Sequence, residues 1–336
     1  MAQRIGRYTL QMTNRPTIEG FASVVGKKEM QGPLSNFFDL SFEDTTLGES
    51  SWEKAESRLQ TEAVNLALRK AGVTAQDIDY IFAGDLLNQC LSSTFGLRSL
   101  DIPFLGQFGA CSTMAQTLAL ASIVVESGAA RKAAAVTSSH FCSAERQFRL
   151  PLEYGGQRTP TAQWTATASG SVIVGTSGKG PFVADVTVGR IVDLGIKDAA
   201  NMGAAMAPAA AQTISDFLQD TGTMPKDYDL ILTGDLGLIG TKLVRQILAD
   251  NNLDITDVHN DCGMMLYDRE KQDVHAGGSG CGCSASVLCS VILNRLQSRE
   301  LNNVLFIATG ALTSTTSQQQ GESVPGVAHL VHLTST

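Results

Sequence analysis

Cys111 is the residue of this chain that is best placed for covalent chemistry. It lies in the turn GACST (109–113), after an apolar strand expected at 102–108 and before an apolar helix expected over 112–128, whose first turn would carry the thiol. A helix N-terminus offers unpaired N–H groups and the positive end of the helix dipole, and both favour a thiolate. A thiolate is the nucleophile of acyl transfer, whereas a helix end of this kind can also simply cradle an anion. A third interpretation is that Cys111 only packs, as most buried cysteines do.

A second set of candidates lies in segment 138–166, which is too long for a plain connection. Arginine suits the bidentate capture of carboxylates, and aromatic rings can enclose a planar ligand, so we expect a binding loop here. Ser139 and His140 follow a strand and are expected at the pocket. The alternative is that the arginines only pair with neighbouring glutamates, as Arg146 could with Glu145. The cationic and ring-bearing residues of this segment are His140, Phe141, Arg146, Phe148, Arg149, Tyr154, Arg158 and Trp164.

The elements that must position these residues occur twice in the same order. The phrase DIDYIFAGDL (77–86) returns as DYDLILTGDL (227–236), and Gly222, which closes a helix expected at 208–221, stands 150 residues after Gly72, which closes a helix expected from Ser51. A strand, a small-residue helix and another strand then follow in each copy. Duplication explains this order best, and strands that alternate with helices predict an α/β fold.

Two such copies, packed through their most apolar helices (112–128 and about 284–298), predict five layers, α-β-α-β-α. We expect an N-terminal half at 1–175 that carries Cys111 and a C-terminal half at 176–336 that carries His259. Asp85 and Asp235 end equivalent strands of the two copies. Each could cap the turn that follows it, and this interpretation weighs more for Asp235 than for Asp85.

Charge and composition exclude several classes of function. The net charge is −8 and the basic residues form no cluster larger than a pair, which argues against nucleic acid as a partner. No apolar run reaches membrane-spanning length, and the N-terminal segment lacks the apolar core of a signal peptide. Seven cysteines, an odd number, suit a reducing compartment without structural disulfides. His259, Cys262, Cys281 and Cys283 lack zinc-module spacing, and GGSGCG lacks the lysine of a phosphate loop, so we predict neither site.

Three motifs resemble the thiolase/ketosynthase superfamily: GACST (109–113), DVHNDCG (257–263) and GGSGCGCSAS (277–286). The resemblance implies the duplicated five-layer fold, with Cys111 at the nucleophile position and His259 at the histidine position of ketosynthase III. The asparagine usual at the C-terminal glycine turn is missing, and Cys281 stands in its place. The resemblance therefore implies incomplete condensing machinery.

Longer phrases, among them TSSHFCSAERQFRLPLEYGGQ (137–157) and GAAMAPAAAQTI (203–214), resemble the stage V sporulation protein AD family of spore-forming bacteria. This resemblance implies a binding protein for dipicolinate (pyridine-2,6-dicarboxylate), which enters the developing spore and could carry calcium as part of its chelate. It implies a homodimer that pairs through strand 102–108. It also implies a place in the forespore cytoplasm, beside the inner membrane and the membrane subunits of the stage V A transport complex.

The interpretation we favour is therefore binding without catalysis, with no cofactor and no resident metal. The rival is an acyltransferase or ketoacyl synthase that uses Cys111 and His259 on coenzyme A or carrier-protein thioesters. The residues expected to contact the ligand are Asp85, Cys111, Ser112, Ser139, His140, Arg149, His259 and Cys281.

Overall fold

The computed structural model describes residues 2–148 and 158–336. Two five-stranded arrays repeat one topology, in which neighbours among the first three strands pair antiparallel and neighbours among the last three pair parallel. The first sheet runs β3 (Thr17–Val25), β9 (Ala168–Gly175), β7 (Ala133–Ser139), β5 (Tyr80–Gly84) and β6 (Phe104–Gln107). The second runs β10 (Phe182–Thr187), β15 (Gly326–Thr334), β14 (Asn303–Ala311), β11 (Leu230–Thr233) and β12 (His259–Asp261). The register pair Thr17–Phe182 joins them edge to edge.

The repeat is most regular in the outer helices. Helix α2 (Trp52–Ala71) and helix α6 (Met202–Thr221) are offset by 150 residues, and each ends at a left-handed glycine, Gly72 with φ +68° and Gly222 with φ +67°. Glycine adopts this conformation without steric cost, so it terminates both helices cleanly. Helix α6 begins six residues before the expected start at 208 and contains Pro208 in its interior. The division at 175/176 remains a prediction; β9 ends at Gly175 and β10 begins at Phe182.

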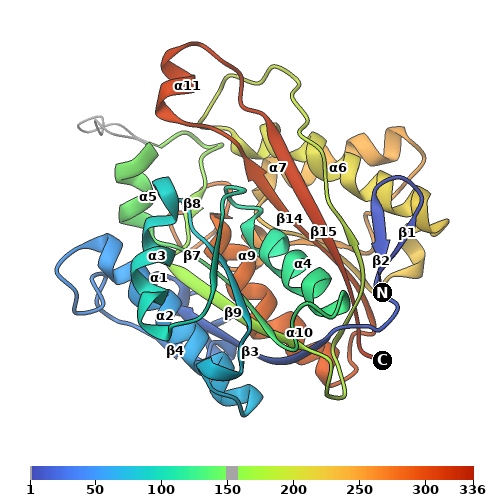
Figure 1. Ribbon diagram of the computed structural model, residues 1–336. Coiled ribbons are helices and arrows are strands. Elements are labelled where there is room, and N and C mark those ends of the chain that lie inside the picture. The colour runs from blue at the N-terminus through green and yellow to red at the C-terminus, as the bar shows by residue number, and fades with distance from the viewer. Residues whose placement is uncertain (1, 149–157) are drawn as a thin grey trace.

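The layers follow the order α-β-α-β-α. Helices α2 and α3 (Leu91–Leu97) cover the outer face of the first sheet, while α6 and α7 (Gly237–Asp250) lie on the second. Figure 1 shows α4 (Thr113–Glu126) and α9 (Cys281–Val287) side by side in the middle. After α9 the helix continues through a π-helical turn (Leu288–Ile292) into α10 (Leu293–Gln297). This middle layer and the inner faces of both sheets form one apolar core, which includes Met114, Leu118, Val172, Leu288, Phe306 and Val331.

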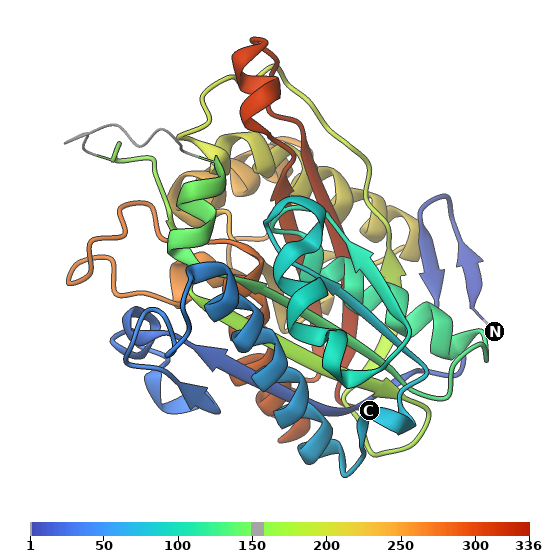
Figure 2. The same ribbon diagram turned by 60° about the vertical axis from the view of Figure 1, so that its left-hand side comes forward.

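The remaining short elements lie at the edges and ends of the sheets. Helix α5 (Phe141–Phe148) follows β7 and stands on the N-terminal end of α2 (Figure 2). The other strands are β1 (Gln3–Ile5), β2 (Thr9–Gln11), β4 (Leu40–Ser41), β8 (Trp164–Thr165) and β13 (Gly278–Ser279). The other helices are α1 (Lys27–Met30), α8 (Cys262–Met265) and α11 (Thr315–Gln319). Single 3-10 turns lie at Ser35–Phe37, Ala75–Asp77, Asn88–Cys90, Arg98–Leu100 and Pro225–Asp227.

Candidate functional site

The Cys111 turn lies just before α4. The helix begins at Thr113 with Ser112 as its N-cap, so Cys111 precedes the helix. The sequence had predicted that Cys111 lies in the first turn. The turn is tight: Ala110 has φ +49°, and both the amide and the hydroxyl of Ser112 donate to the carbonyl of Gly109, at 3.1 and 2.6 Å. A non-glycine residue at positive φ stores strain, which functional sites often hold.

The thiol of Cys111 meets a carboxyl group. Asp235, two residues after β11 in the second copy, interacts with this thiol, and the interaction lowers the pKa of Asp235. The same carboxyl group accepts from the amide of Gly280 at 2.8 Å and from the hydroxyls of Thr309 at 2.9 Å and Ser279 at 3.1 Å. Asp235 is fully buried, and burial raises its pKa to about 6 although the thiol and these three donors oppose that rise. The second half of the chain thus supplies the polar partner of the cysteine in the first half.

Cys111 is consequently a protonated thiol at neutral pH. Burial raises its pKa well above the usual value for cysteine, and the negative charges of Asp235 and of a Cys281 thiolate would raise it further. The expectation that the helix dipole makes Cys111 a thiolate is therefore wrong. A dipole contributes within about one turn of a helix end and is outweighed here by a buried carboxylate that destabilises a second negative charge.

Around Cys111 the wall is apolar and contains a second cysteine. Leu86, Ala144 and Cys281 pack against Cys111, and Phe148 of α5 closes the cluster. The thiol of Cys281 donates to the carbonyl of Ser138 at 2.9 Å, and burial raises its pKa well above the usual value. All seven cysteines of the chain are free.

The structure turns His259 away from this thiol. Its Nε2 lies 3.1 Å from the hydroxyl of Thr233, and the guanidinium of Arg245 on α7 donates to Nδ1 at 3.1 Å. Burial and the Arg245 charge lower the pKa of His259 to about 3, so the ring is neutral. No hydrogen bond joins His259 to Cys111 in the described part of the chain. The resemblance had implied a shared pocket, yet the ring faces the outer helix layer.

The two equivalent aspartates have exchanged the roles expected of them. Asp85 caps its own loop: it accepts from the amides of Leu87 and Ser93, both at 2.8 Å, and from the Ser93 hydroxyl at 2.6 Å. Asp235 was the better candidate for a cap from sequence, yet it contacts Cys111. Sequence reasoning undervalued Asp235 and missed its neighbour Thr309, although the repeat at 77–86 and 227–236 did single out both aspartates.

The remaining candidates are engaged by the backbone. Ser112 donates to the carbonyl of Gly109, and Ser139 donates to that of Ala166 at 2.7 Å. His140 accepts from the amide of Cys142 at 3.1 Å, and its Nε2 lies 2.8 Å from the carbonyl of Thr45. Because burial lowers its pKa, His140 is a neutral ring that fixes the start of α5. These three residues shape the site through backbone contacts.

The arginines of segment 138–166 have other partners than expected. Arg146 forms an ion pair with Glu53 of α2 instead of depending on its neighbour in sequence. Arg158 pairs with Asp273 at 2.9 Å and lies over the ring of Trp164. Arg149 lies outside the described residues. The aromatic expectation is met in part, because Phe141 stacks on Trp164 with ring centroids 3.7 Å apart.

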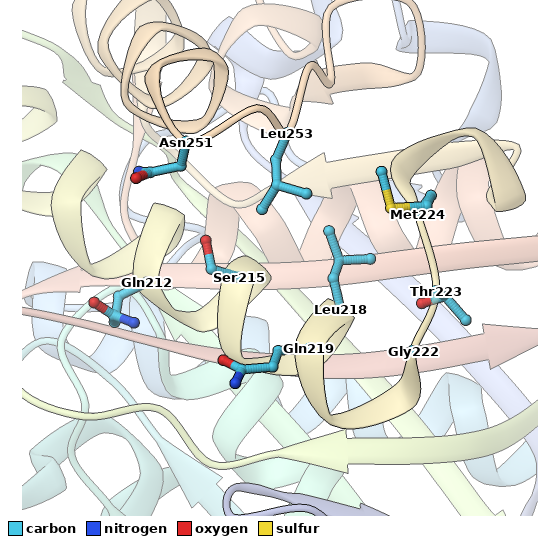
Figure 3. A pocket seen from close by; sticks show the side chains of 9 residues that line it. All are labelled: Gln212, Ser215, Leu218, Gln219, Gly222, Thr223, Met224, Asn251 and Leu253. Carbon is cyan, nitrogen blue, oxygen red and sulfur yellow. The ribbon is translucent and has the colours of Figure 1, made fainter.

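A separate groove of about 530 Å³ lies on the outer surface between α6 and the end of α7. Its lining contains the amides of Gln212, Gln219 and Asn251 and the side chain of Met224 (Figure 3). None of the lining residues is charged, a cysteine or a histidine. This groove therefore offers no thiol, imidazole or charged side chain, and Cys111 remains the candidate site.

The described residues contain neither a cluster of metal ligands nor a helix that could span a membrane. Within 2–148 and 158–336, no three His, Cys, Asp or Glu residues cluster closely enough to hold a metal ion. Over the same ranges, every helix falls short of the length and apolar character needed to cross a bilayer.

Solved structures define the class of this fold. The chain is similar to 3-oxoacyl-[acyl-carrier-protein] synthase III from Aquifex aeolicus VF5, with a TM-score of 0.58 and 13% identity over 95% of this chain and 99% of that one. It is also similar to a variant of OleA from Xanthomonas campestris, with a TM-score of 0.63 and 12% identity over 95% and 96% of the two chains. At these identities the likeness shows the fold alone. The chain has the duplicated thiolase-like five-layer α/β fold of ketosynthase III enzymes.

Sequence similarity identifies the family within this class. The family model of stage V sporulation protein AD matches residues 6–334. Stage V sporulation protein AD of Bacillus subtilis (strain 168) is 45% identical over 324 residues, which cover 96% of each chain. The chain belongs to the stage V sporulation protein AD family.

Proposed function

We propose that this sporulation protein binds dipicolinate at the Cys111 site for its uptake into the developing spore, and that it does not condense acyl groups. The observation that carries the proposal is the buried carboxyl group of Asp235, which interacts with the Cys111 thiol. Acyl transfer needs a thiolate and a base beside it. Here burial and a carboxyl group keep the thiol protonated, and the ring of His259 is held by Thr233 and Arg245. The site therefore keeps the cysteine turn of the fold but lacks the thiolate and the neighbouring base that acyl transfer needs.

The local chemistry also favours calcium with the ligand. The apolar side chains of Leu86, Ala144 and Phe148 suit one face of a planar ring. Asp235, however, would repel a free dicarboxylate once it ionises, with its pKa of about 6. Calcium prefers oxygen donors and would neutralise the dicarboxylate it chelates. We therefore infer that the calcium chelate binds more tightly than the free dianion.

A thermal-shift series tests this function. We expect dipicolinate, and its calcium salt more strongly, to raise the midpoint of unfolding, because a ligand at one hundred times its Kd adds about 2.7 kcal/mol to stability. Acetyl-CoA and malonyl-CoA should leave the midpoint unchanged, and intact mass should show no acyl group on Cys111. An unchanged midpoint with both forms of dipicolinate would contradict binding. Acylation of Cys111 would favour the acyltransferase instead.

We also propose a homodimer through β6. This strand ends the sheet, so one of its edges is unpaired. Phe104, Leu105 and Phe108 are 39%, 45% and 47% exposed on or beside it, with Phe95 of α3 exposed as well. An apolar edge strand is a template for another strand, and a second copy of the same edge is the partner that closes it.

Charge on this edge should separate the two copies. We expect Leu105→Lys to convert the dimer to a monomer, because pairing would bring a lysine from each copy into the interface. Light scattering after gel filtration measures the mass directly. Met224→Lys is the matched control: Met224 is 46% exposed on the outer surface, so this variant should stay dimeric. A dimeric Leu105→Lys would place the interface elsewhere.

The place of the protein in the cell remains part of the proposal. We infer that it works in the forespore against the inner membrane and is held there by the membrane subunits of the stage V A transport complex. Family membership supports this inference. Fractionation of sporulating cells with and without those subunits tests it, and the protein should leave the membrane fraction when they are absent.

A further inference from the structure

Another buried carboxyl group, Glu56 on α2, takes no part in the site described above. Its side chain is fully buried. One carboxyl oxygen lies 3.0 Å from the hydroxyl of Ser138 at the end of β7, and the other lies 2.6 Å from the hydroxyl of Ser143 on α5. Glu56 therefore connects the outer helix α2 to the helix that packs on Cys111.

Helix α5 is a cover over the Cys111 site. Its Ala144 and Phe148 belong to the apolar cluster around Cys111 and Cys281. The helix is short, and of its eight residues only Ser143 and Ala144 are buried. Besides this apolar packing and the stack of Phe141 on Trp164, a few polar contacts hold it, of which the bond between Ser143 and Glu56 is the one in the interior.

The hydrogen bonds around Ser143 require a proton on Glu56. The hydroxyl of Ser143 lies 2.6 Å from the Glu56 carboxyl and also 3.0 Å from the carbonyl of His140. A hydroxyl has one proton to donate, and neither a carbonyl nor a carboxylate can donate one. Both bonds form together only when the carboxyl group of Glu56 is protonated and supplies the proton of the first. An ionised Glu56 would leave Ser143 with one bond in place of two.

The surroundings of Glu56 keep it protonated. The titratable groups that face it are Asp85, at the end of β5, and Cys281, on α9. Burial raises the pKa of Asp85, and the three hydrogen bonds that it accepts from Leu87 and Ser93 oppose that rise and favour its charged form. Burial, and then the negative charge of Asp85, raises the pKa of Glu56 to about 8. The ion pair between Glu53 and Arg146 lies at the surface on the same two helices.

We propose that the protonated carboxyl group of Glu56 holds α5 over the Cys111 site, and that loss of this proton releases α5 and opens the site. Ionisation would place two negative charges side by side in the interior and remove one bond of Ser143. The closed form is then favoured below about pH 8 and the open form above it. The inference depends on the proposed function only for what enters the opened site. The movement of α5 can be measured on the free protein.

Hydrogen exchange of the amides of α5 tests, without ligand, whether protonated Glu56 holds this helix in place. Between about pH 6.5 and about pH 9, after correction for intrinsic exchange, we expect the peptide over 141–148 to lose at least about tenfold in protection, because one pH unit above the pKa leaves about ten ionised molecules for each protonated one. Glu56→Gln should keep its protection at both values, since an amide stays neutral and can donate to Ser143. Glu53→Gln, which removes only the surface pair, should keep the pH response of the wild type.

Two results would overturn the proposal: a pH response in Glu56→Gln equal to that of the wild type, or no response in the wild type. Ser143→Ala guards against a folding defect at position 56. It deletes the hydroxyl of Ser143 with its bonds to Glu56 and to the His140 carbonyl and leaves Glu56 in place, so α5 should exchange rapidly at every pH while the rest of the chain stays protected. Protection of α5 in Ser143→Ala would also contradict the proposal that Glu56 holds α5 through Ser143. Failure of dipicolinate to bind would affect the proposed function and leave these exchange results standing.

Discussion

Gly310→Ala is expected to lower the free energy of unfolding by about 3 kcal/mol and to abolish ligand binding at Cys111. A Cβ on Gly310 of β14 would lie 2.2 Å from the carbonyl oxygen of Gly109 and 3.1 Å from the amide nitrogen of Ser112. Both atoms belong to the backbone of the Cys111 turn, which is already strained at Ala110. A collision with backbone cannot be relieved by a rotamer change, so the strand and the turn must separate. Urea unfolding measures the loss.

The matched control for this substitution is Gly128→Ala. Gly128 has φ +79°, but a Cβ there would meet no atom within 4 Å. Its cost is only that of the left-handed conformation, about 1 kcal/mol, and ligand binding should be unchanged. Equal costs for the two variants would show that contact between β14 and the Cys111 turn is not a constraint on the fold.

Cys111→Trp is expected to weaken dipicolinate binding by at least about a hundredfold, which corresponds to about 2.8 kcal/mol. The indole would fill the space between Cys281, Leu86 and Phe148 and displace α5 from the site. Titration calorimetry with dipicolinate and with its calcium salt measures the loss. The unfolding midpoint of the free variant shows whether it has folded.

Cys111→Ala separates the shape of the site from the chemistry of the sulfur. It removes a protonated thiol that interacts with Asp235, so affinity should change by less than about tenfold. An affinity in Cys111→Trp equal to that of the wild type would place the ligand elsewhere. A complete loss in Cys111→Ala would instead mean that the sulfur itself contacts the ligand.

The repeat was readable from sequence because its signals are local. The glycines that end α2 and α6 and the strands after them are set by residues within a few positions of one another. Hydrophobic periodicity and C-caps report such neighbours well. The duplicated α/β fold followed from them, and solved structures of the thiolase-like class confirm it.

Roles of single residues at the site depended on distant partners. Asp85 and Asp235 occupy equivalent positions, but in the second copy Asp261 accepts the amides of Leu236 and Gly237 at 2.8 and 3.0 Å. Asp261 thus does for the second loop what Asp85 does for the first, and Asp235 is released to face Cys111. No local sequence pattern shows that Asp261 takes over this capping role, because Asp261 lies on another strand. The sequence repeat alone makes the two aspartates look alike.

His259 and Cys111 show the same difficulty in other forms. A motif places His259 on β12 but does not say which face of the strand carries the ring, and the ring faces Arg245. For Cys111 the helix end was readable, but the opposing carboxyl group comes from the other copy. Contacts with residues distant in the sequence determine the roles of both His259 and Cys111.

The single core shared by the two sheets has a consequence for the origin of the chain. Met114 and Leu118 from one repeat pack with Leu288 and Phe306 from the other, so neither repeat covers its own inner face. An ancestor with one repeat would have exposed that face to solvent unless a second copy covered it. A single repeat would therefore need a second copy of itself to cover its inner face, and a chain that carries both repeats leaves each of them free to differ from the other. The asymmetry between Asp85 and Asp235 is a mark of that freedom.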